Sequence, residues 1–160
     1  MIGTLIIVAK TTSMTSENPL SLQEQVCFAL AVASRSVIAL YRPVLGPLGL
    51  THPQYLVMLA LWEHEPLSVR DLSDLLQLDP GTLSPLLKRL EGAGYLRRER
   101  SQHDERALAV ELTREGRALR RRALKVPPAI VERLGLDVAD LRELQQRLTQ
   151  VIEAATRSPV

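Results

Sequence analysis

The segment from Val69 to Thr113 constrains the fold most, because its hydrophobic period changes partway along. Two helical patterns separated by a turn are followed by two short alternating segments, 95–100 and 107–112, which are joined by a charged tip at 101–106. Apolar residues three and four apart are typical of helices, whereas alternation is typical of strands. The order helix, turn, helix and hairpin predicts a winged helix-turn-helix, which is a DNA-binding architecture.

Caps and prolines mark the expected helix ends. Ser68 is the expected cap of a short helix whose inward residues are Leu72, Leu75 and Leu76. Asp79-Pro80 is expected to start the recognition helix, which ends at the glycines of 92–94. Because Pro85 lacks a backbone donor, either this helix kinks there or its regular part begins at Ser84.

Four further helices are expected outside this segment. The first starts at Asn18-Pro19, or at Ser21 with Glu24 as a capping box, and ends in the proline- and glycine-containing stretch 43–49. The others are expected from about 51 to 65, from Thr113 to the prolines at 127–128, and from about 138 to 155.

The two terminal helices carry apolar stripes that a small winged-helix core does not use. The stripes are Val26, Leu30, Ala33, Val37 and Leu40, and Val138, Leu141, Leu144, Leu148, Val151 and Ile152. The two helices pack either on each other or on a second chain, and we favour the second chain because a two-helix flap would leave apolar surface in water.

These patterns predict a mainly α fold with a small β-hairpin wing, dimerised through its N- and C-terminal helices. Residues 1–18 are expected to be a disordered arm or a start-site extension. Residues 19–50 and 114–157 are expected to form the dimerisation region, and 51–113 the winged helix-turn-helix.

Composition narrows the class of protein. An aromatic content of 3% requires an aliphatic core, which favours helices, and the lone cysteine excludes an internal disulfide and is typical of the reducing cytoplasm. We find no run of about 18 apolar residues, so no membrane span is expected. The three histidines have no metal-ligand spacing with each other or with Cys27, so neither a metal nor a cofactor is expected.

The placement of charge favours DNA as a partner more than the net charge of +2 does. Between Lys88 and Arg122 there are eleven basic and six acidic residues. The N-terminal residues of a recognition helix reach base edges, residues one turn later suit phosphates, and a wing arginine suits the minor groove. The predicted DNA-binding residues are Gly81, Thr82, Ser84, Lys88, Arg89, Arg98, Asp104 and Arg106, with Asp104 orienting Arg106 by a charge-assisted bond. For any one arginine alone, simple solvation of the surface is the better explanation.

Two runs carry a resemblance to a known family. DPGTLSPLLKRLEGAGYLRRERSQHDERALAVELTREG, from Asp79 to Gly116, resembles the MarR family of dimeric winged-helix regulators, and its DERALAVELT is similar to the family's D-x-R wing motif. QVCFALAVASRSVIALYRPVLGPLGLTHPQYLVMLALWEH, from Gln25 to His64, resembles the organic hydroperoxide sensors of that family, the OhrR type. The resemblance covers about residues 20–155.

Cys27 is the predicted redox-sensing residue. A peroxide sensor reacts as a thiolate, and in the second turn from Ser21 a helix dipole is already fading, so other donors are needed. Tyr41 follows Cys27 by fourteen residues and shares its face, but at about 21 Å the two cannot touch within one chain. They can touch if the first helices of two subunits pack antiparallel.

The resemblance implies this arrangement, with two tyrosine hydroxyls of the partner subunit bonded to the thiolate. Tyr41 matches the first of these tyrosines, whereas His52 stands at the position of the second. His52 either donates a hydrogen bond or, if protonated, brings positive charge.

The resulting hypothesis is a homodimeric repressor that releases a pseudo-palindromic operator when organic hydroperoxide oxidises Cys27. Because this chain has no second cysteine, it resembles the one-cysteine kind, in which a mixed disulfide with a low-molecular-weight thiol, or over-oxidation, would complete the switch. An alternative is a regulator released by a non-covalent phenolic or aromatic ligand, with Cys27 structural. A thiol peroxidase is disfavoured by the DNA-reading module, so no enzyme is expected.

Overall fold

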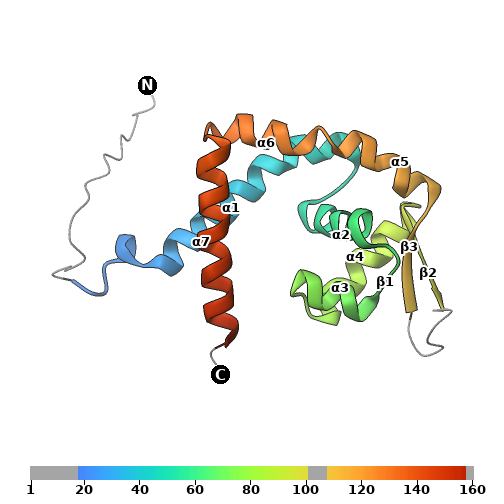
Figure 1. The fold of residues 1–160 in the computed structure, drawn as a ribbon, viewed down its shortest axis with the longest axis horizontal. Coiled ribbons are helices and arrows are strands. Elements are labelled where there is room, and N and C mark those ends of the chain that lie inside the picture. Colours follow the sequence, from blue (N-terminus) through green and yellow to red (C-terminus); the bar gives the residue numbers. More distant parts are fainter. Residues whose placement is uncertain (1–17, 101–107, 158–160) are drawn as a thin grey trace. The chain divides into compact units, whose positions relative to one another are not determined.

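The computed structural model describes residues 18–100 and 108–157 (Figure 1). The predicted N-terminal arm, apart from Asn18, and the wing-tip residues Asp104 and Arg106 lie outside these ranges. The chain divides after Val37 into two compact units, and each is described by itself.

In the first unit, the long helix begins later than either predicted start. A short 3-10 helix, η1, spans Leu22–Glu24, and α1 then runs Val26–Leu45, continuing into the second unit. The predicted capping box at Ser21 is wrong, because the Ser21 side chain makes no cap bond and Gln25 adopts an extended conformation. Cys27 is therefore the second residue of α1, in its first turn rather than its second.

α1 is long and apolar enough to cross a membrane, by length and composition only, with a mean hydropathy of 1.4 over Val26–Leu48. This corrects the expectation that the chain holds no such stretch. Arg35 falls near the middle of the stretch, where a charged side chain costs about 3 kcal/mol in a bilayer. At its C-terminal end Leu45 is buried in the protein core. We therefore interpret α1 as a packing helix of a protein interface.

The second unit contains the predicted winged helix-turn-helix. After the 3-10 helix η2 (Gly46–Leu48) come α2 (His52–His64), β1 (Leu67–Ser68), α3 (Val69–Leu76), α4 (Pro80–Gly92), β2 (Leu96–Arg100) and β3 (Leu108–Leu112). The strands form one antiparallel sheet in the order β1-β3-β2 beside α3 and α4 (Figure 1). The two-residue β1 was not predicted, because it is too short to show alternation.

Local capping explains where these helices start. The backbone N–H of Thr51 donates to the Gln54 side chain at 2.9 Å, ahead of α2. Ser68 caps α3 by accepting from Asp71 N at 3.0 Å, as predicted. Asp79 caps α4 by accepting from Thr82 N at 2.9 Å. These caps satisfy N–H groups that have no partner within the helix.

The C-terminal part contains one more helix than predicted. α5 spans Arg114–Ala123, and after a turn α6 spans Val126–Leu134, followed by α7 (Val138–Arg157). The prolines at 127–128 stand in the first turn of α6, where a missing N–H costs nothing, and so begin a helix rather than end one.

The core lies where α2, α3, α4 and the sheet meet. It is aliphatic, as the composition required, and its fully buried side chains include Val57, Leu61, Leu72, Leu83, Leu90 and Val110. The prediction that Leu75 faces inward is wrong, since its side chain is 51% exposed. A helix of only eight residues turns one narrow stripe to the core, and here that stripe is centred on Leu72.

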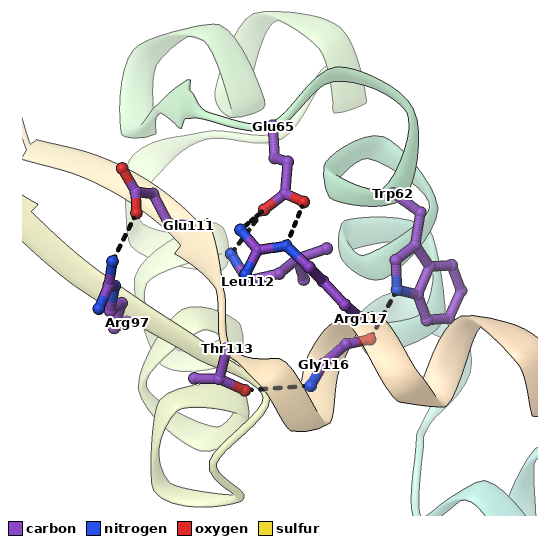
Figure 2. A network of polar contacts seen from close by, with 8 residues as sticks. All are labelled: Trp62, Glu65, Arg97, Glu111, Leu112, Thr113, Gly116 and Arg117. Carbon is purple, nitrogen blue, oxygen red and sulfur yellow. Dashed lines mark hydrogen bonds and ion pairs between the residues drawn. The ribbon is translucent and has the colours of Figure 1, made fainter.

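The start of α5 is locked to the helix-turn-helix and to the wing (Figure 2). Thr113 Oγ1 accepts from Gly116 N at 3.0 Å, and Trp62 Nε1 of α2 donates to Gly116 O at 2.9 Å. The carboxylate of Glu65 accepts from Arg117 Nε at 2.9 Å and from Leu112 N of β3 at 3.0 Å. The end of α2 is thereby joined to β3 and to the start of α5, both of which come much later in the sequence.

Glycine is required at position 116 by a close backbone contact. A Cβ atom on Gly116 would lie 1.9 Å from the carbonyl oxygen of Tyr95. That oxygen is held in place because it accepts from Thr113 N at 3.1 Å. No side-chain rotation can relieve the overlap, because both atoms belong to the backbone or are fixed to it.

We predict that Gly116→Ala destabilises the protein by about 3 kcal/mol, because α5 must move away from Tyr95 to admit the methyl group. Chemical denaturation measures the change. Gly92→Ala is the matched control, because a Cβ there meets nothing within 4 Å. That control should be neutral or stabilise by up to about 1 kcal/mol. Equal stability of the two variants would contradict the account of this junction.

Candidate DNA interface and redox site

The outer face of α4 carries the residues predicted to read DNA. Leu83, Leu86, Leu87 and Leu90 are buried against the core. The predicted DNA-binding residues of α4 are exposed on its other side: Gly81, Thr82, Ser84, Lys88 and Arg89. The structure therefore brings these five predicted residues to one solvent-facing surface, while the leucines anchor the helix behind it.

The N-terminal turn of α4 is built around Asp79. Thr82 Oγ1 donates to Asp79 Oδ2 at 2.6 Å, and these hydrogen bonds from Thr82 hold the pKa of the Asp79 carboxyl below its usual value. Ser84 Oγ donates to Pro80 O at 2.7 Å. Each hydroxyl thus donates its hydrogen bond within the helix. Unless the hydroxyl rotates, it can only accept a hydrogen bond from a base edge. A Cβ at Gly81 would lie 3.0 Å from Asp79 Oδ1, which favours glycine there.

Pro85 lies inside the helix. α4 is assigned from Pro80 through Gly92, so its regular part does not begin at Ser84. Pro85 has no N–H to donate to Gly81 O, four residues earlier. Its exposed ring stands on the same outer face as Ser84.

Lys88 and Arg89 are the exposed cations one turn further along. Among residues 18–100 and 108–157, no ion pair joins either of them to a carboxylate. Both side chains are therefore available to phosphates.

Arg97 and Arg98 of β2 differ from Lys88 and Arg89, because they are paired within the protein. Arg97 Nη2 bonds to Glu111 Oε2 at 2.9 Å, across the β2–β3 ladder (Figure 2). Arg98 Nε donates to Glu91 Oε2 of α4 at 3.1 Å, and Arg98 N donates to Glu91 Oε1 at 3.2 Å. Hydrogen bonds from Arg98 lower the pKa of the Glu91 carboxyl. The structure thus gives Arg98 a partner that the sequence analysis did not find.

Tyr41 and His52 lie side by side in the second unit. Their ring centroids are 4.8 Å apart in an edge-to-face arrangement, and Tyr55 lies 6.0 Å from Tyr41. Burial raises the pKa of the Tyr41 hydroxyl and lowers the pKa of the His52 imidazole. Both shifts favour the neutral form. Near neutral pH the pair therefore offers two neutral hydrogen-bond donors, and the alternative of a positive His52 is disfavoured.

Cys27 belongs to the first unit and its side chain is exposed. In the single chain it is therefore not the small buried hydrophobe that free cysteine usually is. Its place in the first turn of α1 puts it near backbone N–H groups that lack partners within the helix and favour nearby negative charge.

Among the described residues no group of histidine, cysteine, aspartate and glutamate gathers in a way that would hold a metal ion.

The sequence analysis missed two residues that contact predicted site residues: Glu91, which pairs with Arg98, and Tyr55, whose ring lies beside that of Tyr41. Glu91 is separated from Arg98 by a helix end and a turn, so no helical or strand period links them.

Comparisons with known proteins agree with this geometry. A profile of the MarR family matches residues 50–108. The organic hydroperoxide resistance transcriptional regulator of Bacillus subtilis (strain 168) is 40% identical over 134 residues, which are 84% of this chain and 91% of that protein. The structure of overoxidised AbfR bound to DNA is 34% identical, covers 84% of this chain and 94% of that one, and has a TM-score of 0.68. AbfR is a protein of Staphylococcus epidermidis, and its reduced form has also been solved bound to DNA.

The fold and the outer face of α4 define a winged-helix DNA-binding transcriptional regulator. The chain belongs to the MarR family. The relatives that it matches are transcriptional regulators rather than enzymes.

We predict that Lys88→Gln weakens DNA binding about equally for all sequences and lowers the slope of log affinity against log salt by about one, because one phosphate contact is lost. Fluorescence anisotropy at several salt concentrations measures both quantities. An unchanged slope would show that Lys88 does not contact a phosphate.

His52 should make stability fall at acid pH. Because its folded-state pKa is lowered, the unfolded chain takes up the proton first, so stability is full above about pH 6.5 and declines as the pH falls through that value toward the folded-state pKa. His52→Gln removes this contribution. The loss of melting temperature between about pH 7.5 and 5.5 should therefore be smaller in the variant than in the wild type. An equal loss of melting temperature in the variant and the wild type would contradict a half-buried, neutral His52.

Proposed function

We propose that this protein is a homodimeric, cytoplasmic transcriptional repressor that senses organic hydroperoxides by oxidation of Cys27 and then releases its operator DNA. The observation that carries the proposal is the pair of neutral donors, Tyr41 and His52, with ring centroids 4.8 Å apart. A half-buried tyrosine and histidine that both stay neutral can donate hydrogen bonds to a partner group that becomes negatively charged. The relative of Bacillus subtilis, named as an organic hydroperoxide resistance regulator, supports the choice of signal.

The dimer accounts for the apolar surface of the terminal helices. No residue of α7 is buried in the single chain, and its apolar seam is exposed at Val138, Leu144, Leu148, Val151 and Ile152. On α1, Val26, Val32 and Ile38 are likewise exposed. A second copy that packs on both helices would cover this surface, whose exposure in water is unfavourable.

In the proposed dimer the first helices of the two subunits run antiparallel. Cys27, near the start of α1, then meets Tyr41 and His52 of the other subunit. Two donated hydrogen bonds would stabilise the thiolate, each contributing about 1.5–3 kcal/mol in a site that excludes water. The exposed position of Cys27 in the single chain leaves its sulfur accessible to such a partner.

The chemistry is a two-electron oxidation. The Cys27 thiolate attacks the terminal oxygen of the hydroperoxide, and the O–O bond breaks to leave a sulfenic acid on Cys27. The alkoxide leaves and takes a proton to become the alcohol. The sulfenic acid condenses with a low-molecular-weight thiol, forming a mixed disulfide and water. Because the chain has one cysteine, the second sulfur must come from outside it.

A group added to Cys27 would act at the interface between subunits. α7 connects to the wing through α6 and α5. The first turn of α5 is bonded to Trp62 and Glu65 at the end of α2, and Glu65 is bonded in turn to Leu112 of β3 (Figure 2). Displacement of α5 would change the distance between the two recognition helices, which would then no longer match half-sites about 34 Å apart. Release of DNA follows from that change in spacing.

A second candidate function is release by a non-covalent aromatic ligand, which one cavity favours. The cavity, of about 370 Å³, is lined by side chains of α2 and α5 that include Tyr55, Leu59, Trp62 and Arg120. Aromatic walls, the guanidinium of Arg120 and the carboxylate of Glu63, which also lines the cavity, suit a polar aromatic ligand such as a phenol. In this case Cys27 is structural, and a Cys27→Ser protein would still release DNA when a phenolic acid is added.

We predict that wild-type protein bound to a pseudo-palindromic duplex from its own promoter is released by organic hydroperoxide plus a small thiol, whereas Cys27→Ser stays bound. Fluorescence anisotropy of the labelled duplex gives the bound fraction. The serine variant is nearly isosteric and cannot be oxidised, so it separates redox sensing from general damage. Release of both proteins, or of neither, would contradict the redox proposal.

A further inference from the structure

The recognition helix and the wing are joined by a short turn. α4 ends at Gly92, and Gly94, with φ of +79°, lets the chain reverse into β2. Tyr95 N donates to Leu90 O at 3.0 Å and closes the turn. A turn of this length fixes where β2 starts. The direction in which the hairpin leaves α4 needs a further contact.

Glu91 and Arg98 provide that contact. Arg98 donates through Nε and Nη2 to Glu91 Oε2, and its backbone N–H donates to Oε1, so both carboxylate oxygens of Glu91 are engaged. The side chains are only 30% and 35% exposed, for arginine and glutamate respectively. A charge-assisted pair that also holds a backbone N–H fixes both the side chain and the strand of Arg98.

The face of β2 on which Arg98 lies supports the same conclusion. Side chains alternate along a strand, and Leu96, two residues before Arg98, is buried in the core. Arg98 therefore shares the inner side of the strand. Arg97 and Glu99 lie on the opposite side, where both are exposed and pair with each other at 3.3 Å.

We propose that Arg98 is a positioning residue and not a DNA contact, and that its bonds to Glu91 set the angle between the recognition helix and the β2–β3 hairpin. With the pair intact, α4 and the wing form one rigid surface that faces DNA. Without it, the base of the hairpin is still anchored by Leu96 and by the pairing of β1 with β3, but the part beyond Leu96 is less ordered. Ordering that part again on DNA costs binding free energy. This inference rests on DNA binding through α4 but not on the redox role of Cys27.

The test is the DNA affinity of Glu91→Gln. If Arg98 contacts phosphate, freeing it from Glu91 should raise the affinity and steepen the salt dependence. If Arg98 positions the wing, the same change should lower the affinity by roughly two- to tenfold with the salt slope unchanged. The two accounts therefore predict opposite signs. Glutamine keeps an oxygen acceptor for the backbone N–H of Arg98, so this variant is the milder one for folding.

Three single variants and one double variant complete the experiment. Arg98→Gln should lose about as much affinity as Glu91→Gln, and the double variant should lose no more than either single one. Glu99→Gln removes the same charge from the outer face of β2, and should leave the affinity unchanged or raise it slightly. Lys88→Gln serves as the reference for a phosphate contact, with its slope lowered by about one.

Higher affinity in Glu91→Gln, a flatter salt slope in Arg98→Gln, or wild-type behaviour of both variants would each overturn the proposal. Circular dichroism checks that the variants are folded, and if Arg98→Gln is not, the sign of the Glu91→Gln effect decides alone. The wild-type titration is a separate control. Failure of the wild type to bind DNA would count against the proposed function, whereas failure of the positioning role requires that the wild type binds.

Discussion

The backbone contact between Gly116 and the carbonyl of Tyr95 is the constraint on which the rest of the unit depends. It brings α5 so close to the start of β2 that only hydrogen can occupy the space. Around it, Trp62 and Glu65 at the end of α2 bond to α5 and β3 (Figure 2). α5, which leads to α6 and α7, therefore cannot shift without moving the wing. Because of this rigidity, a displacement caused by a chemical change at the subunit interface would be transmitted to the DNA-binding surface.

Much of the fold follows from local chemistry in the sequence. Ser68 and Asp79 are caps, and α3 and α4 begin directly after them. The alternation at 95–100 and 107–112 becomes β2 and β3 to within one residue. The outer face of α4 was predictable because its leucines recur with helical spacing, which leaves the residues between them exposed. The Tyr41–His52 pair came from the resemblance to hydroperoxide sensors, and the structure supplies its neutral state through burial.

The features that were missed depend on contacts between distant residues or on competition between signals. At Ser21 a capping pattern is present, but Gln25 is extended, so α1 begins at Val26 and Cys27 moves into its first turn. The paired prolines at 127–128 could either end one helix or start another. They start α6 because the chain turns after Ala123, before it reaches them. Arginine on a wing indicates DNA until the structure shows Glu91 within bonding distance of Arg98.

The central claim is that the sensing thiol of one subunit is activated by Tyr41 and His52 of the other, and mixed dimers test it directly. One subunit carries Cys27→Ser, and the other keeps Cys27 but carries Tyr41→Phe and His52→Gln. In the mixed dimer the only thiol faces an intact pair across the interface, whereas the homodimer of the second subunit has no intact pair. The account predicts that the thiol of the mixed dimer reacts with organic hydroperoxide at least about tenfold faster than that of the homodimer, measured by stopped-flow loss of free thiol. Equal, slow rates in both would contradict it.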